Sequence, residues 1–97
     1  MAREQEILNG VIKILTELLS PKKIILFGSR AKGTHSPFAD FDFAVDAVKP
    51  EIGIRTQLND AIEKVAGLYS IDVVYLDAVE NDFKDIILSS GKIIYGR

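Results

Sequence analysis

The chain contains no cysteine, and this absence excludes whole classes of protein. A disulfide-stabilised scaffold and a metal centre built from thiolates both need cysteine, and its absence fits a reducing compartment. Long apolar runs are also missing, because none approaches the ~20 residues that a helix needs to cross a bilayer. The N-terminal stretch is charged and is not followed by a small-residue cleavage site. We therefore expect a cytoplasmic protein with no membrane association.

A strong charge of either sign is lacking as well. The 12 basic and 14 acidic residues give a net charge of −2. Such a chain has no general attraction to nucleic acid or to anionic membranes. A local basic pocket is still compatible with the sequence, because four basic residues lie close together, at Lys22, Lys23, Arg30 and Lys32. The single histidine, His35, lies in a polar stretch with no serine nucleophile and orienting acid beside it, so we expect no catalytic role for it.

The composition, with 47% hydrophobic and 27% charged residues, is typical of a globular protein. The length predicts one domain covering residues 1–97. Apolar residues recur every three or four positions over 7–19, which predicts an amphipathic helix. The apolar run 23–27 predicts a strand that is buried on both faces. Further strands are predicted at 41–47, 70–77 and 92–95, and further helices at 50–67 and 81–91, the last with Phe83, Ile86 and Ile87 inward. This order predicts an α+β (α/β-like) sheet with helices on one side.

Two carboxylates lie one residue apart in an apolar stretch, at Asp40 and Asp42. Side chains alternate between the faces of a strand, so both acids share one face, with Cα atoms roughly 6.6–7 Å apart, while Phe41 and Phe43 share the other. Neighbouring carboxylates repel unless a cation separates them, and oxygen ligands favour Mg²⁺ or Mn²⁺. Asp72, the only charge within its apolar strand, is the candidate third acid. Each of these acids, taken alone, is also typical of a solvated strand face or edge.

A glycine and a serine, Gly28 and Ser29, directly follow the first predicted strand. Glycine lets the backbone approach a ligand closely, and free N–H groups at the start of a helical turn suit a phosphate. Arg30 and Lys32 could add charge near a triphosphate, although an ordinary turn explains this stretch as well. A P-loop is excluded, because Thr34 stands where that motif requires lysine.

The two features stand at a fixed spacing: G-S at 28–29, ten residues, D-x-D at 40–42, and a third acid at Asp72. Over roughly residues 23–77 this arrangement resembles the nucleotidyltransferase superfamily of DNA polymerase β. The short chain is similar to its minimal nucleotidyltransferase (MNT) branch. One position departs from the pattern: Ala39 stands where serine is usual, which puts a secondary hydrogen bond in doubt.

The resemblance implies a nucleotidyltransferase fold, in which helices pack on one face of a mixed sheet and the active site lies on the other. It also implies that Gly28 and Ser29 hold the β- and γ-phosphates of ATP or another nucleoside triphosphate. Arg30 and Lys32 are the further candidates for binding that nucleotide.

The acids take their roles from the same resemblance. Asp40, Asp42 and Asp72 would bind two Mg²⁺ ions, with Mn²⁺ as a possible substitute. Asp72 would also help to activate an acceptor hydroxyl as a base. That hydroxyl would attack the α-phosphate, accept a nucleoside monophosphate and release pyrophosphate.

A partner is implied too. Members of the MNT branch are commonly encoded beside a helical HEPN-domain protein, which they neutralise as antitoxins, in some cases by attaching AMP. Larger relatives carry a further domain that grips the acceptor, so here we expect the acceptor site to come from another protein or from a second copy. Two alternatives stay open: an antitoxin that acts by occlusion without chemistry, and a structural or interaction module with a solvated acidic strand.

Overall fold

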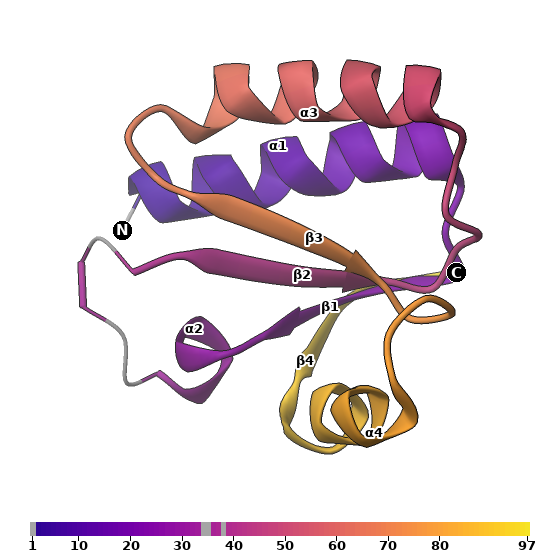
Figure 1. The fold of residues 1–97 in the computed structure, drawn as a ribbon. Coiled ribbons are helices and arrows are strands. Elements are labelled where there is room, and N and C mark those ends of the chain that lie inside the picture. Colours follow the sequence, from indigo (N-terminus) through magenta and orange to yellow (C-terminus); the bar gives the residue numbers. More distant parts are fainter. Residues whose placement is uncertain (1, 34–35, 38) are drawn as a thin grey trace.

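The computed structural model describes residues 2–33, 36–37 and 39–97. The chain alternates helices and strands and ends on a strand (Figure 1). The elements in chain order are α1 (Ala2–Leu19), β1 (Lys23–Phe27), α2 (Ser29–Lys32), β2 (Phe41–Val45), α3 (Ile52–Ala66), β3 (Ile71–Tyr75), α4 (Asn81–Ser90) and β4 (Lys92–Gly96).

The strands form one four-stranded mixed sheet in the order β3-β2-β1-β4. β1 is antiparallel to both β2 and β4, whereas β3 is parallel to β2. The parallel pair is joined through α3, because two parallel strands need a crossover connection. The predicted mixed sheet and the last edge strand are confirmed, and the strands predicted at 41–47 and 70–77 are shorter than expected.

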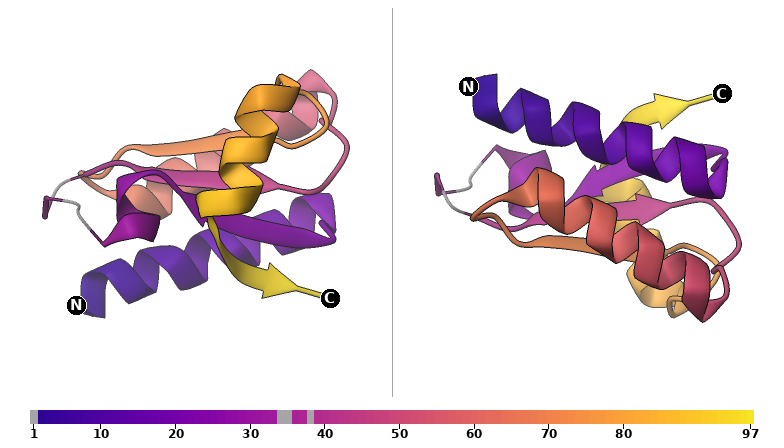
Figure 2. Two further views of the ribbon diagram at one scale, coloured as in Figure 1. Left: turned by 90° about the horizontal axis from the view of Figure 1, so that it is seen from below. Right: turned by 90° about the horizontal axis from the view of Figure 1, so that it is seen from above.

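The two long helices, α1 and α3, lie side by side over one face of the sheet (Figure 2). Residues at the predicted helical spacing in α1, including Ile7, Val11 and Leu15, are fully buried there. Gly10 allows the helices to approach, because a Cβ at that position would collide with the side chain of Val65. The largest buried side chains on the sheet side of this core are Phe41, Phe43 and Ile24.

The opposite face of the sheet carries a smaller apolar cluster, Ile25, Ala44, Leu76 and Ile87, and α4 covers it. The expectation that helices pack on one side therefore holds for the long helices and is wrong for α4. The reason is that the inner strands also carry apolar side chains, such as Ile25 and Ala44, on the face away from the long helices, so both faces need a cover. β1 is buried on both faces, as predicted.

α1 and α3 end at the predicted signals, whereas the inward face predicted for α4 is wrong at Phe83 and Ile86. α1 stops before Ser20, and α3 stops at Gly67, whose φ of 62° favours glycine. On α4 only Ile87 is buried, whereas Ile86 is 59% exposed and Phe83 lies at the surface, edge-on against Phe27. No helix in the described ranges is long and apolar enough to cross a membrane.

Candidate functional site

Two of the predicted acids are cross-strand neighbours. Asp42 lies on β2 opposite Asp72 of β3 in the parallel register, and adjacent strands are about 4.8 Å apart. Both side chains leave the sheet on the face away from the large core, since Phe41 and Phe43 alternate with Asp42 and are buried on the other side. Asp40 precedes β2 and is exposed. The structure thus brings together acids that are thirty residues apart in sequence.

The electrostatics of Asp42 show that these acids act on one another. Burial raises the pKa of the Asp42 carboxyl above its ordinary value of 3.8, and the negative charges of Asp72 and then Asp40 raise that pKa further. A carboxylate in this position favours any cation that neutralises the cluster.

The turn formed by Gly28 and Ser29 lies next to Asp42. Phe27, the last residue of β1, pairs with Asp42, so the turn that follows lies beside the acid. Gly28 has φ 75° and ψ −157°, a conformation that is almost restricted to glycine. A Cβ at Gly28 would collide with Oδ2 of Asp42. Glycine is therefore required here twice, by its backbone and by the carboxylate, and Ser29 begins the short helix α2 immediately after it.

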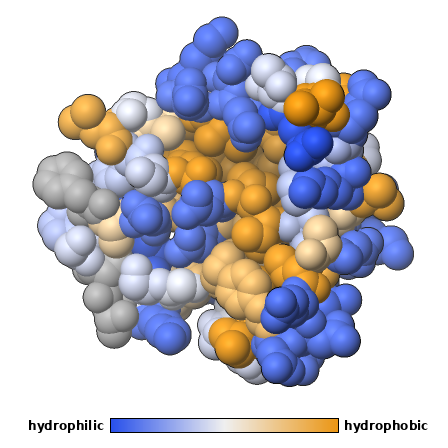
Figure 3. All heavy atoms as spheres, viewed as in Figure 1, coloured by the Kyte–Doolittle hydropathy of each residue, from blue (hydrophilic) through white to orange (hydrophobic). Residues whose placement is uncertain are grey.

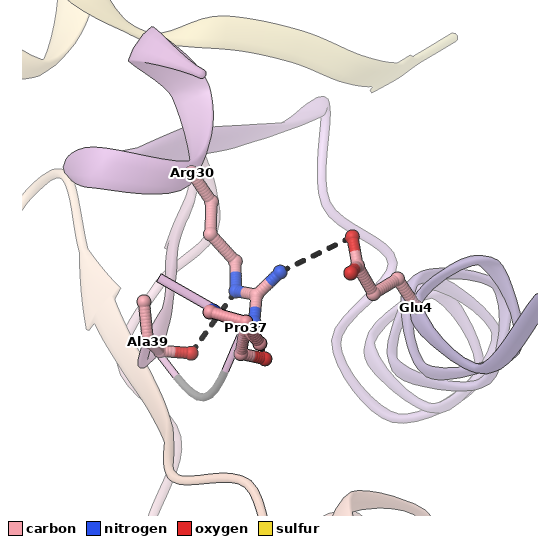
Figure 4. A network of polar contacts seen from close by, with 4 residues as sticks. All are labelled: Glu4, Arg30, Pro37 and Ala39. Atoms are coloured by element: carbon pink, nitrogen blue, oxygen red, sulfur yellow. Dashed lines mark hydrogen bonds and ion pairs between the residues drawn. The ribbon is translucent and has the colours of Figure 1, made fainter. Parts of the chain in front are cut away.

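Arg30 is not where the sequence placed it. Its side chain is buried, its guanidinium stacks 3.8 Å from the centre of the Phe41 ring, and it forms an ion pair with Glu4 at 3.3 Å. Arg30 also donates hydrogen bonds to the carbonyls of Ala39 (3.0 Å) and Pro37 (3.3 Å), as Figure 4 shows. The guanidinium faces the core side of β2 and is engaged there, so the structure does not support the predicted contact of Arg30 with phosphate.

This arginine instead positions the segment that precedes the acids. The carbonyl of Ala39 accepts its hydrogen bond directly before Asp40, whichever side chain residue 39 carries. Lys32, by contrast, is exposed on α2 and remains available to a ligand. Thr34 and His35 lie outside the described residues.

The residues fit a divalent cation that a nucleotide helps to bind. Within the described part of the chain, no three His, Cys, Asp or Glu side chains already converge as a metal cage. Mg²⁺ does not need such a cage, because proteins usually hold it with one or two carboxylates while substrate phosphates and water complete its shell. Asp42 and Asp72 would supply the carboxylates, and the turn at Gly28 would supply a phosphate position beside them.

Two hollows meet at Asp72, and sequence reasoning missed both. One, which we name the edge groove, has a volume of about 460 Å³ and runs between β3 and α3, past Arg55 and Tyr75. The other, of about 670 Å³, follows the loop from Ala66 to Asp72. On the face seen in Figure 3, apolar surface gathers in the middle, between hydrophilic side chains. Burial raises the pKa of Tyr75, and the positive charge of Arg55 opposes that rise.

Comparison with known proteins identifies the family. Residues 9–97 match the family described as polymerase beta, nucleotidyltransferase. No curated protein sequence matches the chain.

Three solved structures share the fold. A chain of a toxin–antitoxin complex with AMP-PNP is 26% identical, with a TM-score of 0.77 over 92% of this chain and 73% of that one. A chain from a complex of the tri-AMPylated Shewanella oneidensis HEPN toxin with its MNT antitoxin is 23% identical, with a TM-score of 0.72 over 98% and 73%. A structure assigned as a minimal nucleotidyltransferase is 19% identical, with a TM-score of 0.70 over 87% and 85%.

The match covers the acids, the turn, α3 and the part of α1 from Asn9 onward, and the shared fold agrees with it. The resemblance predicted from the G-S and D-x-D spacing is thereby confirmed, and the chain belongs to the polymerase β family of nucleotidyltransferases.

Proposed function

We propose that this protein transfers AMP from ATP to a hydroxyl group of a HEPN-domain partner and thereby acts as its antitoxin. The observation that carries the proposal is the position of Asp42, which is paired with Asp72 and lies against Gly28. One carboxylate thus joins a phosphate-type turn to a second acid. Support comes from two similar structures, one with AMP-PNP and one containing an AMPylated HEPN toxin.

Each residue has a role in this proposal. The backbone at Gly28 and Ser29 binds the β- and γ-phosphates. Lys32, the last residue of α2, adds a positive charge. Asp40, Asp42 and Asp72 hold two Mg²⁺ ions or, in their place, Mn²⁺. Such ions neutralise the phosphates and stabilise the leaving pyrophosphate.

Asp72 is also the base in this proposal. It is exposed and lies on the edge strand, where an acceptor from another molecule can reach it, whereas Asp42 is flanked by β1 and β3. The acceptor hydroxyl loses its proton to Asp72 as its oxygen attacks the α-phosphate. We propose a cytoplasmic activity, which fits ATP as the donor.

Calorimetry of Mg-ATP binding tests the site. The Asp42→Asn variant keeps the shape of the side chain but removes the charge, so we expect its affinity for Mg-ATP to fall at least tenfold. Asp60→Asn, an exposed acid on α3, is the matched control and should bind as the wild type does. Equal affinity in all three proteins would refute the metal-assisted site.

Transfer itself is tested with the HEPN-domain protein encoded beside this chain. We expect co-purification, and a gain of AMP mass on the partner when Mg-ATP is added, which the Asp42→Asn variant should not produce. If a variant with all three acids changed to Asn neutralises the partner fully, occlusion rather than transfer is the antitoxin mechanism.

A further inference from the structure

The outer edge of β3 is open. β3 ends the sheet, and in the described residues it pairs only with β2. Phe41 N–H donates to the carbonyl of Ser70 at 2.9 Å, and Leu76 N–H donates to the carbonyl of Val45 at 3.0 Å. Backbone groups alternate in direction along a strand, so the even-numbered residues of this strand face β2.

The odd-numbered residues of β3 therefore direct their backbone groups outward, into the edge groove. Tyr75 uses its carbonyl for a turn, where it accepts from Ala78 N–H at 2.9 Å. Both groups of Ile71 and Val73, and the N–H of Tyr75, face the open edge. A row of this kind is a template for an added strand.

The opposite wall of the edge groove carries positive charge. Arg55 of α3 and Lys49 both line it. The Nε atom of Arg55 is buried and has no hydrogen-bond partner among the described residues. A buried donor without a partner is costly, and a carboxylate is the acceptor that a guanidinium binds most strongly.

The edge groove is positively charged at the Tyr75 end, on the core face of the sheet, and negatively charged at Asp72, on the opposite face. Arg55 acts on Tyr75, at the end of β3, and α3 covers the core face of the sheet. Asp72 lies three residues earlier and projects from the other face, at a distance along the strand of about 10 Å for a rise of 3.3 Å per residue. In an added strand, two side chains that are three residues apart also point to opposite faces.

We propose that the edge groove binds an extended polypeptide that adds a strand to β3, and that this polypeptide carries the acceptor hydroxyl three residues away from a carboxylate. The carboxylate binds Arg55, and the hydroxyl then lies beside Asp72. This inference rests on the proposed transfer function and names the form of its acceptor. A helical surface has no free ladder of backbone N–H and C=O groups to pair with this row, because its helices use those groups internally, and a nucleic acid has no such groups.

Amide hydrogen exchange on the full chain tests the docking mode. The probe is an eight-residue Thr/Val-rich peptide with Tyr and Glu three residues apart, made in both orders because either strand direction is possible. In the free protein the amides of Val73 and Tyr75 should exchange quickly and those of Asp72 and Val74 slowly. The peptide should slow the first pair selectively, and its N-methylated version should not.

If the peptide at millimolar concentration does not slow exchange at Val73 and Tyr75, the proposal is overturned. Protection of Val73 and Tyr75 by a single-stranded RNA oligonucleotide alone, or by self-association of the protein as its concentration rises, would also overturn it.

Arg55→Gln separates the carboxylate contact from the backbone ladder. It should weaken peptide binding roughly tenfold, because it removes a charged hydrogen bond. Lys64→Gln, which removes an exposed charge from the same helix, is the matched control and should bind like the wild type. Replacing Glu of the peptide by Gln should weaken binding to the wild type but not to Arg55→Gln, and equal loss in both proteins would refute the pairing.

The two proposals can fail separately. Peptide docking with no Mg-ATP-dependent transfer to any acceptor refutes the transfer function and leaves the docking groove in place. Transfer to the HEPN-domain partner at an unchanged KM in Arg55→Gln, with no protection of Val73, refutes the groove and leaves the transfer function in place.

Discussion

The two faces of the sheet differ in composition: one is an apolar core, and the other combines a small apolar cluster with charged residues. The face under α1 and α3 holds a continuous apolar core, with Phe41 and Phe43 fully buried. The face under α4 has only a small apolar cluster and carries a repelling pair, Asp42 and Asp72, on adjacent strands. Because side chains alternate along β2, one strand serves both faces. The fold concentrates stability on one side, which lets it tolerate destabilising charges on the other.

The largest effect should come from the core face. Phe43→Ala removes a fully buried ring and leaves a cavity, so we expect the free energy of unfolding to fall by about 3–5 kcal/mol. Urea unfolding followed by circular dichroism measures this loss. Leu88→Ala, on the half-exposed surface of α4, should cost less than about 1.5 kcal/mol. Similar losses in the two variants would remove the contrast between the faces.

Gly28→Ala should cost about 1–3 kcal/mol from backbone strain alone, with a further loss from its collision with Asp42. The same unfolding measurement checks it. In the double variant Gly28→Ala/Asp42→Ala the collision is removed, so part of the loss should be recovered. Gly33→Ala is the control, since its φ is also positive but no atom of the described residues lies within 4 Å of the added Cβ. If the double variant recovers nothing, the turn and the acid are not in contact.

Arg30→Met should destabilise the protein by about 1–3 kcal/mol, because the carbonyls of Ala39 and Pro37 lose a charged donor and the ion pair with Glu4 is lost. Arg3→Met, which removes an exposed arginine from α1, should cost less than about 1 kcal/mol. Thermal unfolding distinguishes them. Nucleotide affinity should fall in Arg30→Met only through the loop, so a variant that keeps full stability but loses ATP binding would contradict this positioning role and indicate a direct phosphate contact.

The smallest effect has the opposite sign. The pKa of Asp42 is raised in the folded state, so its contribution to stability is fully present below 3.8 and is lost as pH rises through the raised value. Without metal, Asp42→Asn should therefore be slightly more stable than the wild type at neutral pH, and the difference should shrink on acidification. Unfolding in EDTA between pH 4 and 8 measures it. Asp60→Asn should show no such trend.

Sequence patterns predicted most of the core face and part of the acid face. The spacing of Ile7, Val11 and Leu15 determines a helix face through geometry alone, and it was read correctly. The meeting of Asp42 with Asp72 followed from the family pattern, because no local rule specifies the pairing of two strands separated by a helix. The position of Arg30 could not be predicted, since nothing in G-S-R-A-K shows that its side chain turns back to Glu4. Whether the acids and the turn bind metal and nucleotide stays a prediction.

The ion pair between Arg30 and Glu4 has a practical consequence. It ties the first turn of the N-terminal helix to the segment that leads into Asp40. Affinity tags and trimmed starts are usually treated as harmless at this end of a protein. Here, any alteration that frays the first turn also loosens the approach to the acids, so enzymatic measurements should compare proteins tagged at opposite ends.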